Sequence, residues 1–370
     1  MPLVPQDAIS FLQDLIRIHA LSTGEHDIAA RVLDEWRVLA FDDVRLDEVG
    51  NTLGLVKGRE EGPAWLLLTH LDHVHEGDES LWPHPPYEGV LHDERVYGRG
   101  AVDIKGPLAA QTYALASLLR NGKRPRRDVW IAAVVEEEIG GRGASHLVAN
   151  APAPIGGVIV GEPSGNRLML GHRGVAHVRV RLAGRAHHAS LSLPDNPLFA
   201  LGELLRRVQA VQLPTHPVVG RSTLTPTQVT TDSGSENLTP NTATVVLDWR
   251  PSETEEQMRA TLAELLDGLP AEGEVPPMWS TQNTPGFATP PSHPLVATVL
   301  PYAQPLMLGE APGIWSFATD GRYTAEAGWP TVGWGPGDEK LAHTVRESIG
   351  VRELEDHVEA LSRLLFDQAP

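Results

Sequence analysis

Histidine and carboxylate side chains in this sequence gather in a few short motifs, and these residue types bind metal ions or move protons. The motifs lie at the carboxyl ends of predicted strands or in the loops that follow, where open α/β sheets place their functional sites. The 370 residues include no cysteine, so thiol nucleophiles and cysteine-held metals are excluded, and any metal must rely on His, Asp and Glu. The motifs are His70-Leu71-Asp72, Gly98 to Asp103, Glu136-Glu137-Glu138, Gly161-Glu162 and Ala342-His343-Thr344.

The first two motifs each allow a metal ligand and a plainer role. Strand periodicity puts His70 and Asp72 on one face, so the carboxylate can orient an imidazole that binds metal. A surface strand end would show the same spacing. Gly98 and Gly100 allow a sharp turn before Asp103, a carboxylate that could bridge two cations. Asp103 also suits the N-cap of the predicted helix that follows, and the local sequence leaves both interpretations open.

Three consecutive glutamates after the apolar run 129–135 are harder to explain structurally. Like charges at the end of a buried strand need cations or raised pKa values. In a metal site, one of Glu136–Glu138 would be a ligand and a neighbour would be the general base for a metal-activated water. A solvated loop is the alternative. Glu162 follows the apolar run 158–160 in the same way, whereas His343 alone also suits a surface loop.

The composition restricts the class of partner. A net charge of −18 repels phosphate backbones and anionic lipid, so neither a nucleic-acid nor a membrane partner is expected. The longest strongly apolar run, residues 129–135, is far shorter than the ~20 residues of a membrane span. The N-terminus lacks the basic and apolar regions of a signal peptide, so we expect a cytoplasmic protein. The length favours two or three compact domains.

Hydrophobic periodicity predicts the elements that must position these side chains. Alternating helix and strand patterns predict an α/β catalytic domain in two segments, 1–174 and 285–370, with a mixed, mostly parallel sheet covered by helices. Between them, at 175–284, the order changes to βαββαβ, which is typical of a ferredoxin-like sandwich and indicates an inserted domain. Its elements are expected at 177–183, 196–210, 222–231, 242–250, 252–267 and 276–282.

Taken in order along the chain, these motifs resemble the M20 family of zinc aminoacylases and exopeptidases, which includes acetylornithine deacetylase and succinyl-diaminopimelate desuccinylase. The resemblance covers most of the chain and implies a catalytic domain of the zinc-peptidase type. It also implies that the inserted domain is a lid that forms a homodimer. Beyond the five motifs, it extends to Arg99–Gly106, His188-Ala189-Ser190, Asn237–Pro240, Asp248-Trp249-Arg250 and Thr319–Arg322.

Carried over residue by residue, the resemblance implies two divalent metal ions, Zn²⁺ or alternatively Co²⁺. His70 and Glu162 would hold one ion. Glu138 and His343 would hold the other, and Asp103 would bridge the two.

The resemblance further implies residues for catalysis and for substrate binding. Glu137 would be the general base, Asp72 would orient a ligand histidine, and His188 would stabilise the oxyanion from across the dimer. A clamp for the substrate carboxylate suits the bidentate guanidinium of arginine. Its implied members are Arg322, with Arg250 or Asn237.

The strings 103–110 and 335–344 look most like lysine and ornithine deacylases, including the enzyme that releases lysine from its carrier protein LysW. We therefore expect a hydrolase of N-acylated amino acids in lysine or arginine biosynthesis. A dipeptidase, a carboxypeptidase or a succinyl-diaminopimelate desuccinylase is the enzymatic alternative, and Thr319–Arg322 favours the last. An inactive dimeric binding protein is the non-enzymatic alternative. The acidic chain argues against an acidic carrier as substrate, because such a carrier would favour a basic docking patch.

Overall fold

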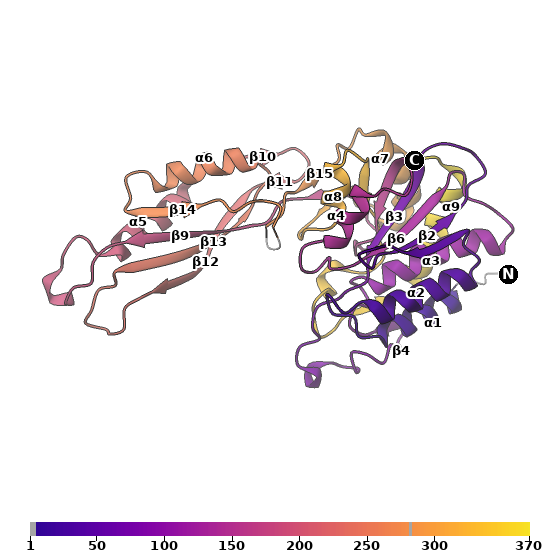
Figure 1. Cartoon of the computed structure of the whole chain (residues 1–370), viewed down its shortest axis with the longest axis horizontal. Helices are drawn as coiled ribbons and strands as arrows, with labels where there is room; N and C mark the ends of the chain where they lie inside the picture. The colour runs from indigo at the N-terminus through magenta and orange to yellow at the C-terminus, as the bar shows by residue number, and fades with distance from the viewer. Residues whose placement is uncertain (1–4, 281–282) are drawn as a thin grey trace. The chain divides into compact units, whose positions relative to one another are not determined.

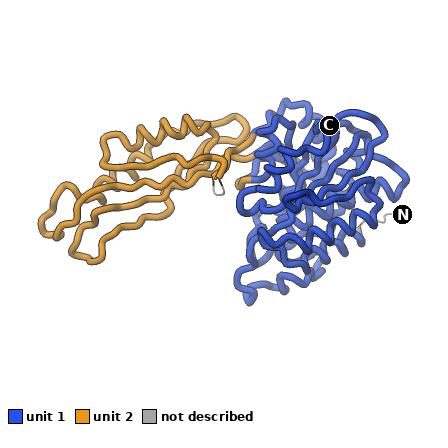
Figure 2. The backbone as a smooth tube through the Cα atoms, in the orientation of Figure 1, with its two compact units in different colours: residues 1–171, 288–315, 319–370 blue, residues 172–287, 316–318 orange. Residues whose placement is uncertain are grey.

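The structure is a computed structural model that describes residues 5–280 and 283–370, and its chain divides into two compact units (Figures 1 and 2). Unit 1 comprises residues 1–171, 288–315 and 319–370. Unit 2 comprises residues 172–287 and 316–318, where the sequence predicts an inserted domain at 175–284. The confirmed fold class is therefore α/β, with an inserted βαββαβ unit.

A long mixed sheet forms the centre of unit 1, in the order β1-β2-β6-β3-β7-β17-β8-β15, with β16 beside β8. The four adjacent strands β6, β3, β7 and β17 run parallel to one another, whereas β1, β2 and β8 pair antiparallel. The bounds are β1 Asp43–Leu46, β2 Thr52–Val56, β3 Ala64–His70, β6 Val129–Val134, β7 Ile155–Val160, β8 Met169–His172, β15 Phe287–Ala288, β16 Gly313–Trp315 and β17 Thr331–Gly333.

Strands β3 and β6 are buried along their whole length. Residues 64–68 of β3 and all of β6 are continuous apolar runs, which is the pattern of strands covered on both faces. Their parallel register pairs Trp65 with Val129 at one end and His70 with Val134 at the other. The carboxyl ends of these strands therefore lie at the same edge of the sheet.

Helices pack along this sheet and on one another (Figure 1). Helix α3 contacts β3 and β6 and packs on α1 and α9, and almost all of its residues are buried. Helix α9 is amphipathic and buries Leu354, Val358, Leu361 and Leu365 at helical spacing. Within the described residues, no helix combines the length and the hydrophobicity needed to cross a membrane. The bounds are α1 Pro5–Ile16, α2 His26–Val38, α3 Lys105–Arg120, α4 Arg142–Ala149, α7 Pro294–Ala303, α8 Gly321–Glu326 and α9 Val351–Asp367.

Short strands that the sequence did not indicate form a separate sheet in unit 1. Its order is β18-β5-β4, with β4 at Val90–His92, β5 at Arg95–Tyr97 and β18 at Ser348–Gly350. The pairing of β18 with β5 brings the C-terminal segment beside the residues that precede Gly98. This sheet therefore connects two segments that are about 250 residues apart in the sequence and that both matter for the site.

Unit 2 is a four-stranded antiparallel sheet, ordered β12-β13-β9-β14, with α5 and α6 packed against it. Residues Ala176, Val178, Val180 and Leu182 of β9 alternate into its core beneath the helices. The order along the chain is βαββαβ, as the sequence predicts. The bounds are β9 Ala176–Ala183, α5 Pro197–Ala210, β12 Thr223–Thr231, β13 Thr242–Arg250, α6 Glu255–Leu266 and β14 Ala271–Glu274, with a short hairpin of β10 Thr215–His216 and β11 Gly220–Arg221.

The last strand of this unit corrects the prediction of a strand at 276–282. Strand β14 lies earlier, at Ala271–Glu274, and pairs with β9. Pro276 and Pro277 lack backbone N–H groups, so the chain cannot continue the ladder there. Val275 and Met278, on either side of the two prolines, are buried as core side chains. Residues 281 and 282 lie outside the described part of the chain.

Candidate active site

The sheet of unit 1 gathers the predicted chemical residues at the carboxyl ends of its parallel strands. His70 ends β3, the glutamates 136–138 follow β6, and Glu162 follows β7. Because β6, β3 and β7 are neighbours and parallel, these side chains emerge at one edge. Asp103 comes from the turn before α3, and His343 comes from the loop after β17.

Asp103 lies between two histidines at this edge. The Nε2 atom of His70 is 3.1 Å from Asp103 Oδ1 and 3.5 Å from Glu162 Oε1. The Nε2 atom of His343 is 3.1 Å from Asp103 Oδ2 and 3.1 Å from Glu138 Oε1. The structure thus brings all five predicted metal ligands into two groups that share one carboxylate.

These separations match those of donors around a metal ion. With zinc bonds of about 2.0–2.2 Å and tetrahedral angles, two donors on one ion lie about 3.4 Å apart. One ligand atom each from His70, Asp103 and Glu138 can be chosen so that all lie within 4.8 Å of one another. Imidazole and carboxylate donors without any thiolate suit borderline and hard divalent cations. The residues present therefore fit a divalent metal centre.

The electrostatics of this cluster also favour a bound cation. Burial, and then the nearby charge of Asp103, raise the pKa of Glu162 well above its ordinary value and also raise that of Glu138. Burial would also raise the pKa of Asp103, but hydrogen bonds with His343 and His70 outweigh it and lower the pKa. Buried carboxylates this close together need positive charge, from protonated histidines or from a metal ion.

Carboxylates of the same cluster raise the pKa values of the two histidines. Hydrogen bonds with Asp103 and Glu138 raise the pKa of His343 to about 10. Burial alone would lower the pKa of His70, but hydrogen bonds with Asp103 and Asp72 raise it well above its ordinary value. His70 and Glu162 are buried, whereas the His343 side chain is 49% exposed. The cluster therefore has a closed side at His70 and an open side at His343.

The three consecutive glutamates point in different directions. Glu138 contacts His343, as described above. The Glu137 carboxylate lies 3.8 Å from Arg322 Nη1 and is largely buried. Glu136 forms an ion pair with Arg142 at 2.6 Å. The geometry therefore gives each glutamate a different partner, and only Glu138 joins the histidine cluster.

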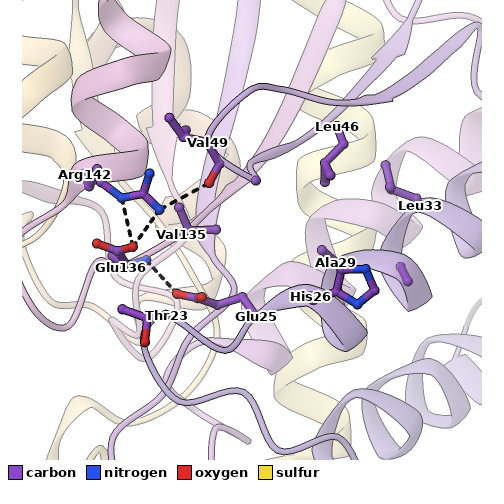
Figure 3. Close-up of a pocket in the computed structure, with 12 residues that line it drawn as sticks. Thr23, Glu25, His26, Ala29, Leu33, Leu46, Val49, Val135, Glu136 and Arg142 are labelled. Carbon is purple, nitrogen blue, oxygen red and sulfur yellow. Dashed lines mark hydrogen bonds and ion pairs between the residues drawn. The ribbon is translucent and has the colours of Figure 1, made fainter.

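The first glutamate, Glu136, lines a cavity of about 370 Å³ (Figure 3). Arg142, which also lines the cavity, pairs with Glu136 and donates to the Val49 carbonyl at 3.3 Å. The backbone N–H of Glu136 donates to the Glu25 carboxylate at 3.0 Å. These contacts hold the first glutamate of the turn in a cavity lined by residues of α2 and β1 and by none of the predicted metal ligands. The walls are lined by Thr23, Glu25, His26, Ala29, Ala30, Leu33, Leu46, Val49, Gly50, Val135, Glu136 and Arg142.

Asp72 connects the first histidine to the glutamate turn. Its carboxylate is fully buried, and its Oδ1 atom lies 3.4 Å from His70 Nδ1. It accepts the backbone N–H groups of Glu137 at 3.1 Å and Glu138 at 3.2 Å. The Ser22 hydroxyl donates to it at 2.6 Å, a contact that no sequence signal indicated. Asp72 is thus placed to orient the His70 ring and the turn that carries the predicted base.

Arg322 lies beside the predicted base rather than in open solvent. Its Nη2 atom is 3.4 Å from Asp320 Oδ1, and its Nη1 atom donates to the Thr319 carbonyl at 3.1 Å. Its buried Nε atom has no hydrogen-bond partner among the described residues. Asp320 is buried as well, and burial raises its pKa to about 6. The resemblance included Asp320 but gave it no role, so its place beside Glu137 comes from the tertiary structure.

Gly141 leaves the space that Asp320 occupies. A Cβ atom at Gly141 would lie 2.4 Å from Asp320 Oδ1, and its φ of +76° is in the left-handed region that favours glycine. The Tyr323 hydroxyl donates to the neighbouring Gly140 carbonyl at 2.5 Å. The turn after the three glutamates and the start of α8 are therefore packed closely together.

The other predicted residues lie in unit 2, and the structure does not gather all of them there. His188 and Asn237 are both exposed, and the N–H of Ala189 donates to the Asn237 carbonyl at 2.9 Å. Arg250 ends β13 and pairs with Asp248 at 2.8 Å. Strand β13 spans about 26 Å from Thr242 to Arg250, at about 3.3 Å per residue, and Asn237 lies in the loop that precedes Thr242. Within one copy of unit 2, Arg250 and Asn237 therefore cannot serve one clamp.

The fold and the histidine–carboxylate cluster together define a metal-dependent hydrolase. The sequence profile described as Peptidase family M20/M25/M40 matches residues 66–367, so the chain belongs to this family. The chain is 32% identical to a putative LysW-lysine/LysW-ornithine hydrolase from Pyrobaculum aerophilum, over 96% of each protein. It is 30% identical to a succinyl-diaminopimelate desuccinylase from Alkalilimnicola ehrlichii, over 86% of this chain and 88% of that protein.

Solved structures show the same fold. The aminopeptidase PepT from Bacillus cereus superposes with a TM-score of 0.79 at 18% identity and covers 99% of each chain. At this identity the likeness concerns the fold alone. Family membership and the metal-binding geometry support an enzyme rather than the inactive binding protein that the sequence left as an alternative.

Metal uptake should release protons, with an affinity that increases with pH. In the metal-free protein His343 has a pKa of about 10, so it is protonated at pH 8, whereas a ligand imidazole must be neutral. Binding should therefore expel at least one proton, and affinity should rise about tenfold per pH unit per proton up to that pKa. Isothermal titration calorimetry in buffers of different ionisation enthalpy measures the release. His343→Ala should release fewer protons, and buffer-independent heats in the wild type would contradict the prediction.

Proposed function

We propose that this protein is a two-metal amidohydrolase that cleaves the amide bond of an N-acylated amino acid. Zn²⁺ is the favoured ion, with Co²⁺ as an alternative. The observation that carries the proposal is the position of Asp103, whose two oxygens each lie 3.1 Å from a different histidine. His70 and Glu162 would complete one ion's ligands on the closed side. Glu138 and His343 would complete the other's on the open side.

When bound, such ions polarise the scissile carbonyl and lower the pKa of water, which makes water a nucleophile near neutral pH. The proton transfers are then carried out by the chain's own residues. Glu137 takes one proton from the attacking water as the new C–O bond forms. It returns that proton to the amine nitrogen as the C–N bond breaks, so the products are a carboxylic acid and an amine.

The surroundings of Glu137 suit a general base. Burial, and then the charge of Asp320, raise the pKa of Glu137 well above its ordinary value. A raised pKa brings a carboxylate closer to the operating pH, where one group can both accept and return a proton. Asp72 accepts the Glu137 backbone N–H, so the base is also fixed in place.

Two relatives suggest the substrate class. Their names concern the release of diaminopimelate, lysine or ornithine from an acyl or carrier group. All three products carry two amino groups, so we favour an N-acylated lysine or ornithine. Arg322 would bind the substrate carboxylate, because its buried Nε atom is an unused donor among the described residues.

The inserted unit supports a homodimer in this proposal. Strand β12 is a sheet edge, and nearly all of its residues are exposed along Thr223–Thr231. An exposed edge strand of this length is a template for pairing with another chain. His188 and Asn237 would then serve the partner's active site, where His188 would stabilise the oxyanion. Arg250, at the other end of β13, would have no part in that contact.

A hydrolysis panel tests the substrate class and the need for metal. N-acetyllysine, N-acetylornithine, succinyl-diaminopimelate and simple dipeptides should be compared with metal-free, Zn²⁺-loaded and Co²⁺-loaded protein. We expect no hydrolysis without metal, and a kcat/KM at least about tenfold higher for an acylated lysine or ornithine than for the others. Full activity in protein verified as metal-free would contradict the mechanism. A clear preference for succinyl-diaminopimelate or a dipeptide would replace the proposed substrate.

Substitutions in the glutamate turn separate the base from the ligand. Glu137→Ala should keep both metals and lower kcat by about 10²–10⁴, the usual effect of losing a general base. Glu138→Ala should bind one metal fewer. Elemental analysis and steady-state kinetics measure both effects. Glu136→Gln is the matched control and should change neither, because Glu136 faces Arg142. Exchanged phenotypes for Glu137 and Glu138 would shift the assignment by one residue.

Subunit mixing tests the role of His188. His188→Ala and Glu137→Ala proteins should each be inactive, but heterodimers would contain one site with both residues intact. If the sites act independently, full exchange should restore roughly a quarter of wild-type activity. Activity assays after subunit exchange, with heterodimers verified by mass, provide the measurement. No recovery in verified heterodimers would place His188 in its own chain's site or in a structural role.

A further inference from the structure

Arg99 and Glu347 form a buried ion pair beside Asp103 that the proposed mechanism does not use. Arg99 Nη1 lies 2.6 Å from Glu347 Oε2, and the two residues are 2% and 1% exposed. The other carboxylate oxygen, Oε1, accepts the backbone N–H groups of Val102 and Asp103, each at 3.0 Å. One buried carboxylate thus holds the backbone of the residue whose side chain lies between the two ligand histidines.

Glu347 also belongs to the segment that carries the second histidine. It lies four residues after His343. Its own carbonyl accepts the N–H of Gly98 at 3.2 Å, so the segments 98–103 and 343–347 are joined through both its side chain and its backbone. Because these segments supply Asp103 and His343, the contacts help to set the 3.1 Å separation between Asp103 Oδ2 and His343 Nε2.

The pair is itself held in place. The N–H of Arg99 donates to the Pro86 carbonyl at 2.8 Å, and its guanidinium lies 5.0 Å from the centre of the Trp82 ring. Hydrogen bonds to a charged acceptor are roughly twice as strong as neutral ones, so a carboxylate restrains two adjacent amides better than a neutral group would. An ion pair that only filled the core would have no need to bond the backbone of a ligand.

We propose that Glu347, held by Arg99, is a positioning residue for the metal centre. It fixes the backbone of Asp103 and the segment of His343, so that both are in place before metal binds. This inference rests on the two-metal site of the proposed function. Because both ions would share Asp103, loss of Glu347 should weaken both binding steps, by about the 10–100-fold typical of groups that orient metal ligands.

Cobalt binding to metal-free protein tests the inference without relying on activity. Co²⁺ is titrated into wild type, Glu347→Ala, Glu347→Gln and Arg99→Lys, and the visible absorption of bound Co²⁺ reports affinity, stoichiometry and ligand geometry. Glu347→Ala should bind both equivalents about 10–100-fold more weakly and with an altered spectrum. Glu347→Gln should lie between it and the wild type, because its amide oxygen can still accept one of the backbone N–H groups.

Glu35→Gln is the matched control. Glu35 is also a buried glutamate paired with an arginine, Arg31, at 2.7 Å, but it contacts none of the metal ligands. Its loss should lower thermal stability without changing Co²⁺ affinity or the spectrum. If Glu347→Ala does not fold, Glu347→Gln and Arg99→Lys are compared with the wild type instead. Wild-type affinity and spectrum in the folded variants would overturn the inference, whereas fewer than two Co²⁺ ions in the wild type would overturn the proposed two-metal site instead.

Discussion

Three carboxylates and two imidazoles crowd together at one edge of the unit 1 sheet, and Asp103 lies at their centre, within 3.1 Å of both histidines. In a buried setting, carboxylates repel one another far more strongly than they do in water, so the arrangement requires positive charge. In the protein alone, this charge comes from histidines whose pKa values are raised. A divalent cation would replace those protons, so metal binding and proton release are coupled.

Most of the surrounding structure serves to hold these like charges in place. The buried strands β6, β3 and β7 deliver His70, the glutamate turn and Glu162 to one edge. Asp72 accepts backbone N–H groups from that turn and faces the His70 ring. At Asp103, Glu347 accepts the backbone N–H. Both are buried carboxylates that hold the backbone of predicted metal ligands, and groups of this kind orient the ligands of metal sites.

Much of the fold could be predicted from the sequence. Apolar runs ending in charged residues located the central strands, and the change to βαββαβ order indicated the inserted unit, because both signals are local and periodic. The strand expected at 276–282 was wrong, because Val275 and Met278 are buried while Pro276 and Pro277 end the ladder. The short strands β4, β5 and β18 were missed since three-residue strands show no period.

For the site, the sequence by itself determined the residue types and their order. The absence of cysteine restricted any metal to His, Asp and Glu, and the motif series indicated the family. Only the tertiary structure decided which atoms meet. It separated the partners of Glu136, Glu137 and Glu138, and it placed Arg250 at the end of β13 and Asn237 in the loop before that strand begins. It also brought Glu347 to the backbone of Asp103, 244 residues earlier in the chain. Contacts between such distant segments depend on sheet order and on buried hydrogen bonds, and neither leaves a local pattern in the sequence.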